Sequence, residues 1–110
     1  MGEHIVVLIT ASTEEEAVQI ARALVESRLA GCVNIIQGVR SIYRWQGKVE
    51  DEVEVLMILK TRRALFDELM RRVKELHSYT VPEIISLPIT EGMEEYLEWL
   101  DGAILKPKIQ

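Results

Sequence analysis

The feature that most constrains this chain is a pair of long β-prone runs that meet at residues 45–48. Residues 32–45 and 48–61 are rich in valine, isoleucine and aromatic side chains, which suit a pleated surface. Between the runs, Gln46-Gly47 is typical of a two-residue turn, because glycine readily adopts the positive φ that such a turn needs. The sequence therefore predicts a long β-hairpin in which Trp45 pairs with Lys48 and Tyr43 with Glu50.

This hairpin is expected to extend beyond the domain that carries it. Each arm of about 14 residues corresponds to roughly 45 Å at about 3.3 Å per residue. A compact domain of this size has a radius of gyration of only about 13 Å. Tyr43 and Trp45 lie near the tip, beyond the reach of one chain's core, so we expect another subunit to cover them.

The segments around the hairpin alternate between strand and helix patterns. The unbroken apolar run over residues 5–9 predicts a buried strand. A helix is expected to follow it, with Ser12 or Thr13 as N-cap, Glu15 or Glu16 as capping-box partner and Gly31 as terminator.

After the hairpin, a second helix is expected to begin at a Thr61 cap and to end near His77. Residues 83–89 then predict a strand, with Pro88 at a sheet edge, and residues 93–100 a short closing helix. We expect residues 103–110 to form a loose tail.

This order of elements predicts an α+β fold: a ferredoxin-like βαββαβ sandwich with a long central hairpin and a short C-terminal helix, forming one domain over residues 1–110. Such a fold places both main helices on one face of the sheet. However, residues 5–9, 56–59 and 84–85 are apolar at consecutive positions, so both sides of these strands favour burial. Packing of sheet against sheet between subunits would cover the second side.

Composition excludes several classes of partner and site. The chain has 110 residues and a net charge of −5, which gives no general attraction for nucleic acid or for an anionic membrane. Cys32 is the only cysteine, so a disulfide within the chain and a zinc ribbon are both excluded. Because the start lacks a signal-peptide pattern and no run is long enough to span a membrane, we expect a cytoplasmic location.

The familiar catalytic motifs are missing from the sequence. It contains no glycine-rich phosphate loop, no Gly-x-Ser-x-Gly elbow and no His-Glu-x-x-His helix. Cys32 and His77 could form a nucleophilic pair only with an orienting third group, which the sequence does not supply. Acidic and basic residues on the two arms of the hairpin are interpreted as cross-strand charge pairs. We therefore expect a protein that is not an enzyme.

Five ordered motifs resemble the CutA divalent-cation-tolerance family. They are LAGCVN (residues 29–34), SIYRWQGK (41–48), ILKT (58–61), LHSYTVPE (76–83) and YLEWL (96–100). The resemblance runs from about Val7 to Leu100. It implies a homotrimer of ferredoxin-like subunits, packed sheet against sheet with an architecture like that of PII signalling proteins. It also implies a role in tolerance to copper and other divalent cations, without an agreed catalytic activity.

The resemblance also suggests metal ligands, but it matches them only in part. Some members carry a first-strand cysteine and a His-His pair; here these positions are Ile9 and Leu76-His77. His77 and Cys32 are therefore the candidate metal ligands. Each also has a structural interpretation, Cys32 as a small apolar residue and His77 as a helix cap. We expect copper or another divalent cation to be held weakly, with binding partly lost in His77→Ala, and we expect no structural zinc and no organic cofactor.

Two alternatives to metal binding stay open. A PII-like sensor would bind a small ligand in clefts between subunits; its candidate lining is Asn34, Tyr43, Trp45, Lys60, His77, Tyr79 and Glu83. A scaffold would instead bind another protein through the trimer.

Overall fold

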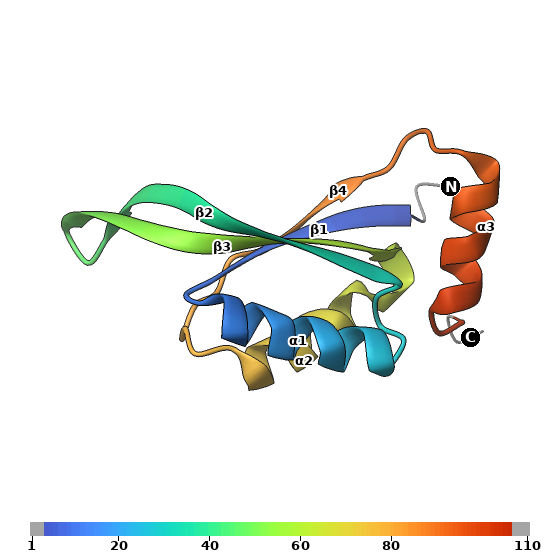
Figure 1. Ribbon diagram of the computed structural model, residues 1–110, viewed down its shortest axis with the longest axis horizontal. Helices are drawn as coiled ribbons and strands as arrows, with labels where there is room; N and C mark the ends of the chain where they lie inside the picture. The colour runs from blue at the N-terminus through green and yellow to red at the C-terminus, as the bar shows by residue number, and fades with distance from the viewer. Residues whose placement is uncertain (1–3, 107–110) are drawn as a thin grey trace.

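The computed structural model describes residues 4–106. Its elements are β1 (His4–Ala11), α1 (Glu14–Glu26), β2 (Cys32–Trp45), β3 (Lys48–Arg62), a 3₁₀ turn η1 (Arg63–Leu65), α2 (Phe66–Leu76), β4 (Ile84–Pro88) and α3 (Glu94–Ala103). The strands form one antiparallel sheet in the order β2-β3-β1-β4. Helices α1 and α2 cover one face of this sheet, and α3 packs at its end (Figure 1). The predicted ferredoxin-like order is confirmed.

The core lies between the sheet and helices α1 and α2. Alternate residues of β1 and β3 point toward the helices, as a strand period of two requires. The fully buried side chains of this layer come from both strands and both helices: Val7, Ile9, Ile20, Leu24, Met57, Leu59, Leu69 and Val73. Leu100 of α3 and Ile104 form a second small cluster with Leu65.

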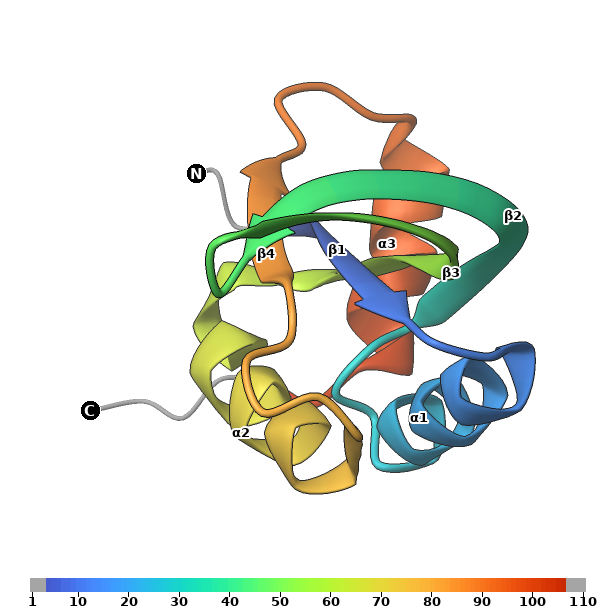
Figure 2. The ribbon, with the colours of Figure 1, turned by 90° about the vertical axis from the view of Figure 1, so that its left-hand side faces the viewer.

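The other face of the sheet is apolar and has neither α1 nor α2 over it (Figure 2). Strand register places Leu8 between Ile58 and Ile85 on this face. Its outer strands expose large side chains: Ile36 is 44% exposed and Leu87 is 50% exposed. The prediction that these strands are apolar on both sides is confirmed. We call this surface the uncovered sheet face.

The β2–β3 hairpin has the predicted register and shape. Trp45 pairs with Lys48 and Tyr43 with Glu50, and the turn residues Gln46 and Gly47 have φ of 51° and 81°. The register shift between Ile36 and Val39 is a bulge at Gly38, which has φ of 78°. The molecule measures 44 × 26 × 24 Å because the hairpin projects beyond the helices (Figure 1).

Two predicted helix boundaries are wrong. Thr61 does not cap a helix: it lies within β3, pairs with Ile5, and donates its hydroxyl proton to the Leu29 carbonyl at 2.7 Å. Helix α2 instead begins after η1, without a side-chain cap. Gly31 does not end α1, because Arg28 already adopts φ of 64° and the Leu29 amide closes back on the Leu24 carbonyl. Gly31 is needed for packing, since a Cβ there would lie 2.5 Å from the Leu100 side chain.

Both the start and the end of the described chain are anchored by specific contacts. His4 begins β1, and its Nε2 lies 2.8 Å from the Asp101 carboxylate. The loose tail does not begin at residue 103, because Ile104 is buried and the Leu105 amide donates to the Arg28 carbonyl at 2.9 Å. Residues 107–110 lie outside the described residues.

Candidate functional site

An open cleft lies between the hairpin and the loop that joins α2 to β4. Its volume is about 660 Å³, within the range of small-molecule sites. β1 and the hairpin contribute one wall, and residues 78–83 contribute the other: Thr10, Ser41, Ile42, Tyr43, Trp45 and Glu54 face Ser78, Tyr79, Thr80, Val81 and Glu83. We call this hollow the hairpin cleft.

His77 fixes the loop wall of this cleft. Its backbone ends α2, and its Nε2 lies 2.7 Å from the Thr10 carbonyl oxygen, to which it donates. Its Nδ1 accepts from the Tyr79 amide at 3.1 Å. Because one nitrogen donates and the other accepts, the ring is the neutral tautomer with the proton on Nε2. His77 therefore ends α2 with its backbone, as predicted, and both of its ring nitrogens form hydrogen bonds that hold the loop after the helix against β1.

Two tyrosine–carboxylate pairs stand at the cleft. The Tyr79 hydroxyl donates to Glu54 at 2.6 Å, and the Tyr43 hydroxyl donates to Glu52 at 2.8 Å. Burial, followed by the hydrogen bond to Glu54, raises the pKa of Tyr79. The hydrogen bond to Glu52 raises the pKa of Tyr43 to about 12. Both phenols thus stay protonated donors at neutral pH.

The predicted cross-strand charge pairing is right for only one pair within residues 4–106. Arg40 binds Asp51 through two hydrogen bonds, of 2.9 and 2.6 Å. Glu52 and Glu54 are bonded to tyrosines instead. The physical reason is the alternation of side chains along a strand, which places Arg40 and Asp51 on the opposite face of the hairpin from both glutamates.

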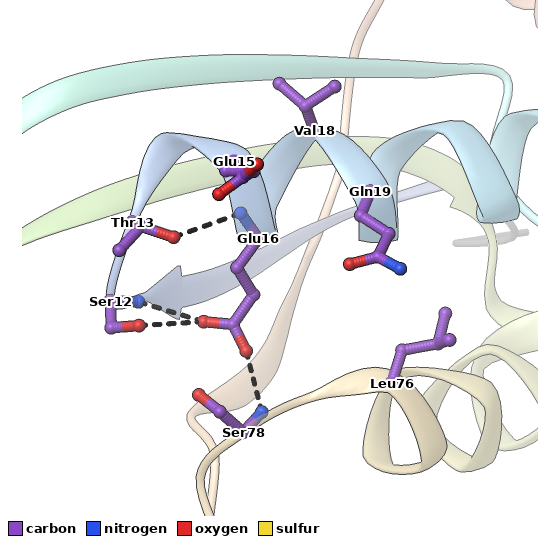
Figure 3. Close-up of a pocket in the computed structure, with 8 residues that line it drawn as sticks. All are labelled: Ser12, Thr13, Glu15, Glu16, Val18, Gln19, Leu76 and Ser78. Carbon is purple, nitrogen blue, oxygen red and sulfur yellow. Dashed lines mark hydrogen bonds between the residues drawn. The ribbon is translucent and has the colours of Figure 1, made fainter.

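Glu16 connects the start of α1 to the same loop (Figure 3). Its backbone amide donates to the Thr13 hydroxyl, as the capping prediction required, and its carboxylate accepts from the Ser12 hydroxyl at 2.9 Å and the Ser78 amide at 2.7 Å. Burial raises the pKa of Glu16, but the bonds from Ser78 and Ser12 outweigh it and the net pKa is lowered. The hydrogen bonds of Glu16 to Ser12 and Ser78 thus cross the hollow of about 590 Å³ at this place and join α1 to the loop.

The predicted ligand-cleft residues separate into two groups. Tyr43, Trp45, Tyr79 and Glu83 line the hairpin cleft, and His77 supports it.

The remaining residues lie at the other end of the sheet. There Lys60 donates to the Asn34 side chain, and the Cys32 thiol lies 4.0 Å from the same amide oxygen. Cys32 pairs with Lys60 of β3, whereas Thr10, which His77 contacts, pairs with Leu56 of β3. Lys60 and Leu56 are four residues apart, so Cys32 and Thr10 are separated by about 13 Å along the sheet. One chain does not bring Cys32 and His77 together.

Metal coordination by a single chain finds little support in this arrangement. Among residues 4–106, no three side chains of the His, Cys, Asp and Glu types gather into a group that could hold an ion. Cys32 is partly exposed on the uncovered sheet face, where another chain could complete a site.

Several residues that line the cleft are not in the predicted set: Thr10, Ser41, Ile42, Glu54, Ser78, Thr80 and Val81. The regular spacing of Glu50, Glu52 and Glu54 was a usable signal, because alternate strand residues share one face.

Comparison with known proteins identifies the family. The model of the CutA1 divalent ion tolerance protein family matches residues 5–103, nearly the whole described chain. This chain belongs to the CutA1 family. The resemblance drawn from the five motifs is thereby confirmed.

Individual CutA relatives agree in sequence and in fold. The divalent-cation tolerance protein CutA of Thermus thermophilus is 60% identical over 95 residues, covering 86% of this chain and 92% of the relative. A solved Thermus structure of the same name has a TM-score of 0.90 at 56% identity, covering 92% of this chain and 98% of that one. CutA1 from Oryza sativa gives 0.92 at 43% identity, covering 94% and 95%.

The compartment differs among CutA relatives. The Arabidopsis thaliana relative, 47% identical over 99 residues, is called chloroplastic, and this chain covers 90% of its own length and 54% of that protein. The solved CutA of Archaeoglobus fulgidus is called periplasmic; it has a TM-score of 0.88 at 45% identity and covers 91% of this chain and 97% of its own. Within residues 4–106, no helix is long and apolar enough to cross a membrane.

Proposed function

We propose that this chain forms a homotrimer that supports tolerance to divalent cations by binding a metal ion or a small ligand at the boundaries between subunits. The observation that carries this proposal is the uncovered sheet face, which exposes Ile36, Ile85 and Leu87. A contiguous apolar surface of this kind favours association. The hairpin extends the same argument, because it leaves Tyr43 38% exposed and Trp45 44% exposed in a single chain.

Light scattering coupled to size exclusion tests the assembly. The expected mass is close to three times the 12.6 kDa chain mass. Leu87→Lys on the uncovered sheet face should lower it, whereas Glu68→Lys, on the exposed side of α2, should not. A wild-type protein that stays at the mass of one chain would overturn the trimer.

The direct form of the proposal is weak to moderate binding of copper or another divalent cation. Cys32 is the soft ligand that another chain could approach, and His77 would have to exchange its bond to Thr10 or Tyr79 for a metal bond. Calorimetry with Cu²⁺ on wild type, Cys32→Ser and His77→Ala tests this. Lower stoichiometry in the variants supports a metal site, and identical isotherms assign both residues to structural roles.

The second form is a small-ligand sensor, and the hairpin cleft favours it. Tyr43, Trp45, Tyr79 and Glu83 meet there in a hollow of small-molecule size, whereas Cys32 and His77 do not meet. Thermal-shift measurements with nucleotides, small anions and small cations test binding at this cleft.

A third form is a scaffold that binds another protein. Capture of a protein partner by the trimer would support it, provided that calorimetry with Cu²⁺ and the thermal-shift measurements both detect no ligand. In each form the protein binds and does not catalyse, and we place it in the cytoplasm.

A further inference from the structure

The lining of the hairpin cleft combines aromatic rings with carboxylates. Tyr43, Trp45 and Tyr79 supply three rings, and Glu54 and Glu83 supply two carboxylates. No lysine, arginine or histidine is among the described residues that line it. Phosphates and other anions would therefore meet a surface of their own charge, so the lining selects against the usual ligands of a nucleotide sensor.

Glu54 is the most informative of these residues. It is only 6% exposed, and its single side-chain hydrogen bond within residues 4–106 comes from the Tyr79 hydroxyl. None of the ion pairs within those residues includes Glu54. Burying a carboxylate without a cationic partner is costly, and a bound cation would offset this cost.

The aromatic rings extend the same preference. The π-face of tyrosine or tryptophan attracts organic cations, and this attraction strengthens when the site is partly desolvated. The register of the hairpin holds Tyr43 and Trp45 on one face, with Glu50 opposite Tyr43 and Lys48 opposite Trp45, and the Tyr43 hydroxyl donates to Glu52. The two arginines of β2, Arg40 and Arg44, lie on the opposite face, and Arg40 is already paired with Asp51.

A bare metal ion fits this cleft less well than an organic cation. The described residues bring no three His, Cys, Asp or Glu ligands together, and the two phenols are protonated donors. The cleft of about 660 Å³ is also far larger than one ion needs. An ammonium group requires only one or two carboxylates, and the rest of the ligand can fill the hollow against the rings.

We propose that the hairpin cleft binds a small organic cation, a primary or quaternary ammonium compound, with Glu54 as its counter-ion and Tyr43, Trp45 and Tyr79 as its aromatic walls. This inference rests on the proposed function, since it names the ligand class of the boundary site. The ammonium group could belong to a free small molecule or to Lys106 of a neighbouring copy, which share this chemistry.

The test uses calorimetry on the full chain with choline and 1,4-diaminobutane as cationic probes. The neutral control is 3,3-dimethylbutan-1-ol, which matches choline in shape, and ATP is the anionic control. We expect at least one of the two cations to bind saturably, and we expect no binding of the neutral alcohol or of ATP. Binding of ATP, or equal binding of the neutral alcohol, would overturn the proposal.

Variants then locate the site. Glu54→Gln keeps an acceptor for Tyr79 but removes the charge, so the dissociation constant should rise at least tenfold. Glu68→Gln makes the same charge change on the exposed side of α2 and should leave binding unchanged. If Glu54→Gln does not fold, Glu83→Gln and Tyr43→Leu replace it. Equal affinity in the folded cleft variants and in Glu68→Gln would contradict the proposal.

The two sources of the ammonium group are separated by Lys106→Gln. Tighter choline binding in this variant would show that a neighbour's Lys106 occupies the cleft, and unchanged binding would assign the site to a free ligand. Light scattering on the same samples keeps the two hypotheses apart. A trimer that binds no cation contradicts only the ligand class, whereas a single-chain mass contradicts the proposed function.

Discussion

Single residues in this chain owe their roles to contacts that the sequence does not display. His77 is a candidate metal ligand whose two ring nitrogens, in one chain, are engaged by the Thr10 carbonyl and the Tyr79 amide. Glu16 was expected only as a capping residue, and it also accepts from Ser78, 62 positions further along the chain. Arg28 adopts a left-handed conformation that usually falls to glycine. The last two positions give direct tests.

Arg28→Gly is expected to stabilise the protein. Arg28 has φ of 64° and an exposed side chain, so glycine would relieve the left-handed strain at this helix end. The free energy of unfolding should rise by about 0.5–1 kcal/mol, because the relief is partly offset by the greater freedom of glycine in the unfolded chain. Denaturant unfolding measures it. Arg28→Ala should give no gain, and a gain from alanine equal to that from glycine would refute the strain argument.

Glu16→Gln is expected to cost stability at neutral pH, by about 1–2 kcal/mol, because the charged carboxylate accepts from Ser12 and Ser78. The pKa of Glu16 is lower in the folded protein than its ordinary value of 4.5. Its contribution is therefore fully present above 4.5 and is lost as the pH falls through the folded pKa. Unfolding curves of wild type and variant should converge in acid. Glu15→Gln, on the exposed side, is the control; a difference that persists at low pH would contradict this.

At the scale of elements, strand pairing and helix periodicity could be predicted, and long-range contacts could not. Gln46-Gly47 fixed the hairpin register because only a two-residue turn fits that pattern. The Thr61 error arose because a threonine before a helical pattern resembles a cap, while its real partner, the Leu29 carbonyl, lies 32 positions away. The cleft was predicted only in part for the same reason. Tyr43, Trp45, Tyr79 and Glu83 were among the predicted lining residues, but Glu54 was not, because its bond from Tyr79 depends on tertiary packing.

The hairpin turn offers a test in which only the backbone matters. Gly47 has φ of 81°, and a Cβ there would meet nothing within 4 Å. Gly47→Ala should therefore cost about 1 kcal/mol through conformation alone. Gly102→Ala in α3 is the matched control, since space is equally open there, no positive φ is involved, and alanine favours a helix. Thermal unfolding of both variants measures the difference, and equal melting temperatures would exclude backbone strain at the turn.

For the whole molecule, the dominant feature is an apolar second side of the sheet that no main helix covers. Leu8, Ile58 and Ile85 form an apolar row with neither main helix above it, and the hairpin projects past the domain. A single chain leaves both surfaces to water, which costs free energy in proportion to the apolar area. The proposed association through the uncovered sheet face and the hairpin would cover both surfaces.

Trp45→Ala tests this assembly at the hairpin. A tryptophan buried at the centre of an interface can contribute about 2 kcal/mol or more. We expect the variant trimer to dissociate at higher protein concentration than wild type, while its helix content and core packing stay intact, because Trp45 is 44% exposed in a single chain and does not belong to its core. Light scattering over a dilution series measures dissociation, and circular dichroism monitors the fold. Trp99→Ala removes an equally large ring that is 51% exposed on α3 and controls for the loss of a tryptophan as such. A Trp45→Ala trimer that resists dilution as well as wild type would place this ring outside the interface, and the hairpin would then have no part in assembly.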